Sequence, residues 1–101
     1  MEYRDLYSGL IRLHILYHAG KEPFFGLWLI EELGRHGYKI SPGTLYPILH
    51  DMEQSGYLVS DKKLHKGKYR RIYRITDEGR LALKAANAKV RELFKELIEG
   101  K

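Results

Sequence analysis

Apolar positions in residues 41–56 recur at spacings of three and four, which is the period of an α-helix. Ser41 and Pro42 suit the start of such a helix, because serine caps helix N-termini and proline is tolerated in the first turn. Gly56 suits the position just beyond its end, where a left-handed residue is favoured. The segment therefore predicts a short amphipathic helix with a defined beginning and end. Its apolar stripe is Leu45, Ile48, Leu49 and Met52.

The opposite face of this predicted helix is polar and has little bulk. A face of small side chains can approach another surface closely. The segment alone fits either the solvated face of a core helix or a binding face, and the rest of the chain has to decide between them. The residues on this face are Gly43, Thr44, Pro47, His50, Asp51 and Gln54, with Tyr46 on the flank.

Two further helical patterns precede it, at residues 4–18 and 24–37, joined by a loop that Gly20 and Pro23 punctuate. The first is apolar on two sides, which is typical of a helix that packs in its own domain and against a second body. We therefore expect Ile11 and Ile15 to contribute to a dimer interface. A short link at residues 38–40 then leads into the small-faced helix, and this arrangement predicts a helix-turn-helix.

Residues 57–75 change character, because β-branched and aromatic residues become frequent and alternate with basic ones. We expect a two-stranded hairpin over residues 58–64 and 69–75, with its tip at residues 65–68. A basic hairpin directly after a small-faced helix predicts phosphate contacts. The alternative is a solvated hairpin whose lysines prevent edge pairing. The region around the tip carries Lys62, Lys63, His65, Lys66, Lys68, Arg70 and Arg71.

A last helical pattern runs from Asp77 to about Glu99, with Thr76 as its cap. Its apolar positions alternate spacings of three and four, as in a coiled-coil seam. We expect dimerisation through this helix, because one side of so small a domain cannot easily cover the seam and its flanks. The alternative is a helix lying wholly across its own domain. The expected interface residues are Leu83, Ala86, Val90, Leu93, Phe94 and Leu97.

A length of 101 residues is that of one small domain. We expect residues 1–76 to form its winged helix-turn-helix DNA-binding part and residues 77–101 its C-terminal dimerisation helix. A net charge of +5 and a pI of about 9.5 suit a polyanionic partner. The absence of cysteine excludes disulfides and thiolate metal sites. With no signal peptide and no membrane-length apolar run, we expect a cytoplasmic protein. No nucleophile–base spacing and no phosphate-cradling glycine loop is present, so we expect neither an enzyme nor a cofactor.

Several segments resemble the PadR family of transcriptional regulators. They are S-P-G-T-L-Y-P-I-L at residues 41–49, then Glu53 and G-Y-L at 56–58, and G-K-Y-R-R-I-Y-R-I-T-D-E-G at 67–79. The segment F-G-L at 25–27 is similar to the family's glycine between its first two helices. The resemblance covers nearly the whole chain, and the length fits the short subfamily with a single C-terminal helix.

The resemblance implies a winged helix-turn-helix, mainly α with a small β-hairpin. It implies a homodimer held by the C-terminal helix with help from the first helix, repression of nearby genes, and release of DNA by a small effector. By position it assigns DNA contacts to Ser41, Thr44, Tyr46 and Pro47 on the recognition helix and to Lys68, Arg70 and Arg71 on the wing. From their chemistry and place we add His50 and Lys66.

One departure from the family pattern and two other features keep alternatives open. Asp51 stands where the family usually has a basic residue, and an acid repels phosphate although it can accept a hydrogen bond from cytosine. It favours the alternative of a dimeric winged-helix protein-interaction module without specific DNA binding. His14 and His18 share a helix face at a spacing of four, but two ligands are not a metal site. We expect Trp28 to pack in the core against the first helix.

Overall fold

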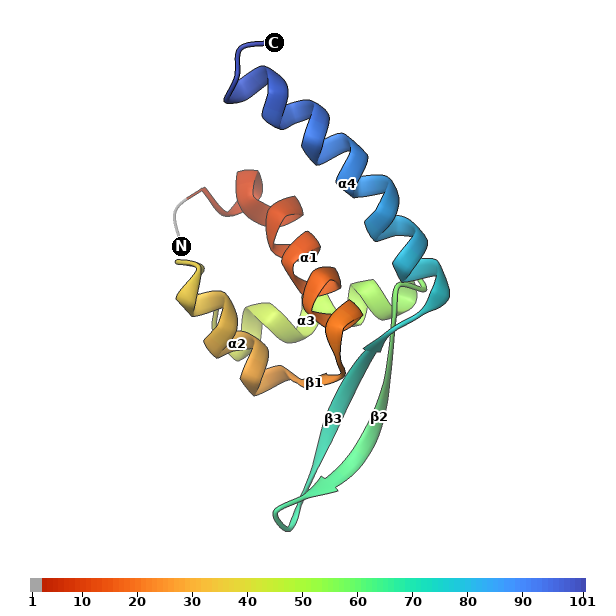
Figure 1. Ribbon diagram of the computed structural model, residues 1–101. Helices are drawn as coiled ribbons and strands as arrows, with labels where there is room; N and C mark the ends of the chain where they lie inside the picture. The colour runs from red at the N-terminus through yellow and green to blue at the C-terminus, as the bar shows by residue number, and fades with distance from the viewer. Residues whose placement is uncertain (1–2) are drawn as a thin grey trace.

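Four helices and three short strands follow one another along residues 3–101, the part of the chain that the computed structural model describes. The first two residues of the predicted 1–76 domain lie outside it. The fold class predicted from the sequence, a winged helix-turn-helix with a long C-terminal helix, is confirmed (Figure 1). The elements are α1 (Arg4–Lys21), β1 (Phe24–Phe25), α2 (Gly26–Arg35), α3 (Pro42–Gln54), β2 (Leu58–His65), β3 (Lys68–Ile75) and α4 (Asp77–Leu97).

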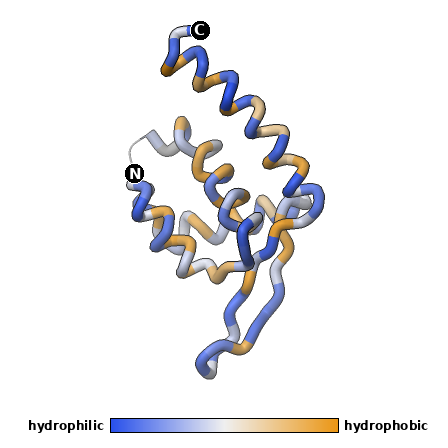
Figure 2. The backbone as a smooth tube through the Cα atoms, in the orientation of Figure 1, coloured by the Kyte–Doolittle hydropathy of each residue, from blue (hydrophilic) through white to orange (hydrophobic). Residues whose placement is uncertain are grey.

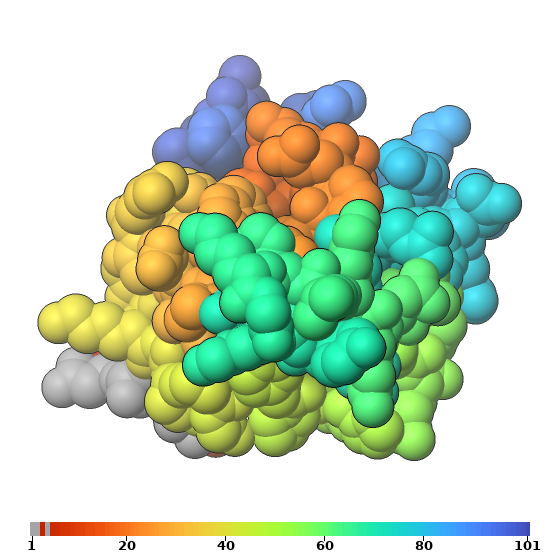
Figure 3. Space-filling model, turned by 90° about the horizontal axis from the view of Figure 1, so that it is seen from below, coloured from red at the N-terminus to blue at the C-terminus, as the bar shows by residue number. Residues whose placement is uncertain are grey.

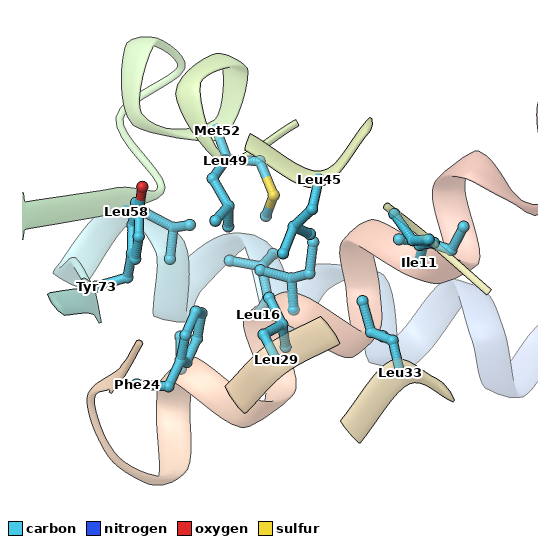
Figure 4. Close-up of a cluster of buried hydrophobic side chains, with 13 residues drawn as sticks. Ile11, Leu16, Phe24, Leu29, Leu33, Leu45, Leu49, Met52, Leu58 and Tyr73 are labelled. Atoms are coloured by element: carbon cyan, nitrogen blue, oxygen red, sulfur yellow. The ribbon is translucent and has the colours of Figure 1, made fainter. Parts of the chain in front are cut away.

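The apolar stripe of α3 faces the core, as its spacing predicts. Leu45, Leu49 and Met52 are buried against apolar side chains of α1, α2 and the sheet (Figure 4). Gly56 has a φ of 86° just past the end of α3, which explains why a glycine stands there. The core therefore fixes which side of α3 remains exposed.

Ile11 and Ile15 belong to this same core, with exposed fractions of 2% and 0%. The prediction that they contact a partner chain is wrong, because their own chain already covers them. The second apolar side of α1 is the one that carries Leu6, Leu10 and Tyr17, which are exposed.

The beginning of the predicted second helix is a strand instead. Phe24 and Phe25 form β1 and pair antiparallel with Tyr73 and Ile72 of β3, which gives the sheet the order β1-β3-β2. The ring of Phe24 stacks on Tyr73 with centroids 5.9 Å apart. Helix α1 also continues to Lys21, through residues that the sequence predicts as a loop.

The hairpin is confirmed, and each of its strands is one residue longer than predicted. Strands β2 and β3 pair from Leu58 opposite Ile75 to His65 opposite Lys68. Lys66 and Gly67 alone make the turn, with φ values of 51° and 77°. Two positive φ angles are what a two-residue turn needs to match the twist of its strands.

The joint between β3 and α4 is closely packed around Thr76 and Gly79. The Thr76 hydroxyl accepts a hydrogen bond from the Gly79 backbone N–H at 2.9 Å and donates one to the Gly56 carbonyl at 2.5 Å. A Cβ at Gly79 would overlap the backbone carbonyl of Tyr57 and lie 2.8 Å from a side-chain carbon of Ile75. The start of α4 is therefore fixed against the hairpin.

We expect Gly79→Ala to lower the free energy of unfolding by about 3 kcal/mol, because the added methyl group must displace backbone. Gly34→Ala is the matched control, since Gly34 lies inside α2 with open space where its Cβ would be. Gly34→Ala should be neutral or stabilising by up to about 1 kcal/mol. Urea unfolding at one fixed protein concentration measures both, and equal stability of the two variants would contradict the close packing at Gly79.

Helix α4 leaves the body of the molecule beyond its first turns (Figure 1). Leu83 still packs against the core and Ala86 is half-buried. Hydrophobic positions continue along the projecting part of the helix (Figure 2). Among the described residues, no helix combines the length and the apolar character that crossing a membrane requires.

Candidate nucleic-acid interface

The exposed side of α3 carries most of the residues that the sequence selected. Ser41, Tyr46, Pro47 and His50 are exposed, whereas Thr44 is half-buried. Thr44 lines a hollow together with Arg12 of α1 and therefore lies on the flank of α3. Ser41 occupies the N-cap position as predicted, but its hydroxyl donates to the Thr44 hydroxyl at 3.4 Å instead of capping the backbone.

Tyr46 is held in place by a glycine of the preceding helix. A Cβ at Gly26 would lie 2.7 Å from the Tyr46 hydroxyl and 2.8 Å from its ring. The absence of a side chain at Gly26 therefore lets the Tyr46 ring lie directly on the start of α2. The sequence contains this glycine in its family pattern but does not indicate which side chain covers it.

Asp51 has a partner that the sequence does not reveal. Its carboxylate lies 3.7 Å from the guanidinium of Arg12 on α1. Both side chains are exposed, so the pair contributes at most about 1 kcal/mol to stability. The guanidinium still places a positive charge beside the acid, which reduces the repulsion that Asp51 would exert on a nearby phosphate.

A hollow of about 410 Å³ separates α3 from the hairpin, with Tyr46, His50 and Arg71 among its lining residues. The Ser60 hydroxyl donates to Glu53 of α3 at 2.8 Å, and Arg71 donates to the Ser60 hydroxyl at 3.2 Å. These two hydrogen bonds connect Arg71 of β3 to Glu53 of α3 through the Ser60 hydroxyl.

The hairpin of β2 and β3, residues 58–75, is the wing of the fold. It has a high density of positive charge, because it contains seven lysine and arginine side chains and one acidic side chain. The register places Lys62 opposite Arg71 and Lys63 opposite Arg70. Since side chains alternate along a strand, Arg71 and Arg70 point to opposite faces of the hairpin. The wing therefore presents cations on both faces.

The predicted wing contacts differ in how accessible they are. Lys66 and Lys68 are exposed at the tip, as is Arg71. Arg70 is half-buried, and its Nε is buried without a hydrogen-bond partner in the described part of the chain. Arg74 is matched by Asp61, with 2.6 Å between guanidinium and carboxylate.

The wing and α3 lie on one face of the molecule. Seen from below, the hairpin side chains project toward the viewer, and the side chains of α3 lie along the lower edge of the same face (Figure 3). Helix α3 and the hairpin therefore face the same side of the molecule, and the tip of the hairpin projects away from α3 (Figure 1, Figure 3).

The expected dimer residues divide into two groups along α4. Leu83 and Ala86 are half-buried within the chain, whereas the others are large apolar side chains left exposed. A groove of about 310 Å³ runs between α1 and α4 and is lined by Leu10, Leu13 and Tyr17 on one side and by Leu83 and Val90 on the other. The exposed group is Val90, Leu93, Phe94 and Leu97.

Trp28 is more accessible than we expected, with 39% of its surface exposed. Its ring stacks on Phe24 with centroids 6.1 Å apart and meets His18 of α1 edge-on at 5.5 Å. The predicted contact with the first helix is present, but the ring is not part of the buried core.

Residues 15–85 match the sequence model of the transcriptional regulator PadR-like family. The chain belongs to the PadR family. This PadR protein is 46% identical over 97 residues to the transcriptional regulator Rv3488 of Mycobacterium tuberculosis, a match that covers 96% of this chain and 91% of that protein. The family resemblance seen in the sequence is therefore confirmed, and with it the general role of a transcriptional regulator.

Solved structures of transcriptional regulators have the same fold. A PadR family regulator from Eggerthella lenta superposes with a TM-score of 0.82 at 32% identity, covering 92% of this chain and 82% of that one. The putative transcriptional regulator TA0346 of Thermoplasma acidophilum superposes with a TM-score of 0.77 at 27% identity, covering 94% and 96%. The similarity spans the projecting helix as well as the winged helix.

Proposed function

We propose that this PadR protein is a cytoplasmic repressor that binds a pseudo-palindromic DNA site as a homodimer. One observation carries the proposal: the small exposed side of α3 and the cationic wing share a face (Figure 3). A double helix offers a groove for the helix and a phosphate backbone for the wing, so it fits both halves of that face.

Helix α3 acts as the recognition helix in this proposal. The major groove is about 12 Å wide and accepts a helix whose outer side is narrow. Gly43 and Pro47 keep that side narrow, while Tyr46 and His50 offer polar groups to base edges and phosphates. Ser41 lies at the N-terminal end and Thr44 at the margin, where it reaches a phosphate more readily than a base.

The wing supplies most of the phosphate contacts. Lys66 and Lys68 at the tip reach the flanking backbone or minor groove, and Arg71 stands between the wing and α3. Arg70 points to the other face, so its contribution is to the local positive potential. Because these contacts neutralise phosphates, DNA affinity should fall steeply with salt.

The exposed part of α4 joins two chains. A symmetric dimer uses the same surface on both copies, and the exposed apolar side chains of α4 together with Leu10 and Tyr17 of α1 form such a surface. Two-fold symmetry then brings two copies of α3 to half-sites roughly 34–36 Å apart, one turn of DNA. A small effector that fills the groove between α1 and α4 would alter this spacing and release the DNA.

The proposal is tested by fluorescence anisotropy on the DNA upstream of the protein's own gene, with a scrambled duplex of equal length as the control. We expect a preference of about 1000-fold or more for the upstream duplex at physiological salt. We also expect affinity for both duplexes to fall as salt rises. Absence of binding to either duplex would contradict the proposal and favour a protein-interaction module.

A further inference from the structure

Four potential ligands from two helices meet beside the groove between α1 and α4. His14 and His18 lie one turn apart on α1, and Glu32 and His36 lie one turn apart on α2 and its C-cap. One ring nitrogen from each of the three histidines lies within 4.8 Å of the other two. The Glu32 Oε2 lies 3.9 Å from the His18 Nε2 and 3.7 Å from the His36 Nε2.

One hydrogen-bonding atom of this cluster has no partner among the described residues. The His18 Nε2 is buried and has no hydrogen-bond partner in the described part of the chain. A buried polar atom without a partner is costly and needs an explanation. The Glu32 side chain is 14% exposed and uses its other oxygen for Arg35 at 2.9 Å, which leaves Oε2 directed at the imidazoles.

Stacking alone does not account for these atoms. His14 stacks on His36 with centroids 4.9 Å apart and meets Tyr38 edge-on, which explains the packing of the rings. The stacking supplies no hydrogen-bond partner for the His18 Nε2 and no reason for the Glu32 carboxylate to face the imidazoles of His18 and His36. Burial also lowers the pKa of His14 and of His18, which is the direction that favours the neutral ring.

We propose that His14, His18, His36 and Glu32 bind one divalent transition-metal ion such as Zn²⁺. Three imidazoles and a carboxylate are a donor set that Zn²⁺ takes in tetrahedral sites. Ligand atoms 2.0–2.1 Å from Zn²⁺ stand about 3.3 Å apart in a tetrahedron. The present separations are larger, at up to 4.8 Å between the histidine nitrogens and 3.7–3.9 Å from the Glu32 Oε2 to His36 and His18, so binding requires the side chains to rotate inward.

The ion joins α1 to α2 at the wall of the groove that α4 completes. His14, His18 and His36 line that groove together with Leu83, Asn87 and Val90 of α4. Metal binding therefore acts on the surface that the proposed dimer uses. This consequence, that the ion is an effector, rests on the proposed function, whereas the metal site itself does not.

The site is tested by titrating Zn²⁺ into the full chain, produced without a histidine tag and stripped with a chelator, in competition with a chromogenic chelator. We expect one ion per chain with a dissociation constant below about 1 µM. Trp28 is the only tryptophan in the sequence and contacts His18, so its fluorescence should change at the same equivalence point. Co²⁺ should give the intense visible bands of four-coordinate geometry.

His36→Asn is the most informative variant, because His36 is half-exposed and its loss should leave the fold intact. It should weaken Zn²⁺ binding by about 100-fold or more, because the loss of a direct ligand costs at least as much as the loss of a group that only orients a ligand. His65→Asn, at the far end of the hairpin, is the matched control and should bind as the wild type does. Wild-type protein without a stoichiometric site, or His36→Asn with wild-type affinity, would overturn the proposal.

The effector role has its own measurement. Zn²⁺ at saturation should change the affinity of the wild type for its specific duplex by about 10-fold, and His36→Asn should not respond at the same Zn²⁺ concentration. Stoichiometric Zn²⁺ binding with unchanged DNA affinity would overturn the effector role while the site stands. Failure of the protein to bind any DNA would contradict the proposed function and leave the metal titration unaffected.

Discussion

Leu93→Asp is expected to convert the protein to a monomer and to remove specific DNA binding with it. Leu93 lies on the projecting part of α4, half-exposed in the single chain and in the middle of the apolar seam. In a symmetric dimer both chains carry the substitution at the interface, so its cost to the free energy of association is incurred twice. Losing two buried leucines at about 1.5–3 kcal/mol each, and burying two carboxylates, raises the dissociation constant of the dimer by about 1000-fold or more.

Sedimentation velocity at micromolar concentration measures the first effect, and anisotropy on the specific duplex measures the second. Leu81→Asp is the matched control, because Leu81 is an equally large exposed side chain of α4 that lies off the seam. It should remain a dimer with wild-type affinity for DNA. A folded Leu93→Asp monomer that retained full specific affinity would show that one chain suffices for recognition.

The double variant Lys66→Ala and Lys68→Ala is expected to weaken binding to every duplex by about 10- to 100-fold, regardless of sequence. Both side chains are exposed at the tip of the wing, where Lys66 lies in the turn and Lys68 pairs with His65. Each lost phosphate contact should also lower the slope of log affinity against log salt by about one. The same titrations at four or five salt concentrations give both quantities.

Its control is the double variant Lys84→Ala and Lys95→Ala, which removes the same charge from exposed positions on α4 away from the seam. If net charge alone governed binding, both double variants would lose the same affinity. We expect the α4 variant to keep nearly all of it. An unchanged slope of log affinity against log salt in the wing variant would show that these two lysines do not contact phosphates.

Segments with a sustained pattern could be predicted from the sequence, and short or two-sided ones could not. The four-residue stripe of α3, the alternation of the hairpin and the long period of α4 each specify one structure. By contrast, β1 is two residues long and exists because Phe24 pairs with Tyr73, far away in the sequence. In α1 both sides are apolar, so only tertiary packing determines that Ile11 and Ile15 face inward.

In the candidate sites too, the sequence predicts local features and does not predict contacts between elements that are distant in the chain. The sequence already predicts a small, polar exposed side of α3 followed directly by a basic hairpin, because the spacing within each segment determines which of its residues share a side. The partner of Asp51 and the cluster around His18 depend instead on how α1 packs against the two helices that follow. Arg12 reaches α3, and Glu32 and His36 reach α1, only after the core has formed.

Selection from a pool of random duplexes tests most directly whether the protein reads DNA sequence as a dimer. Wild-type protein is incubated with the pool, bound duplexes are recovered over several rounds, and the enriched sequences are compared. We predict one two-fold symmetric motif with half-sites roughly one turn, about 10 base pairs, apart. Recovery of duplexes with no common motif, or of a single asymmetric half-site, would contradict sequence-specific binding by a symmetric pair of α3 helices.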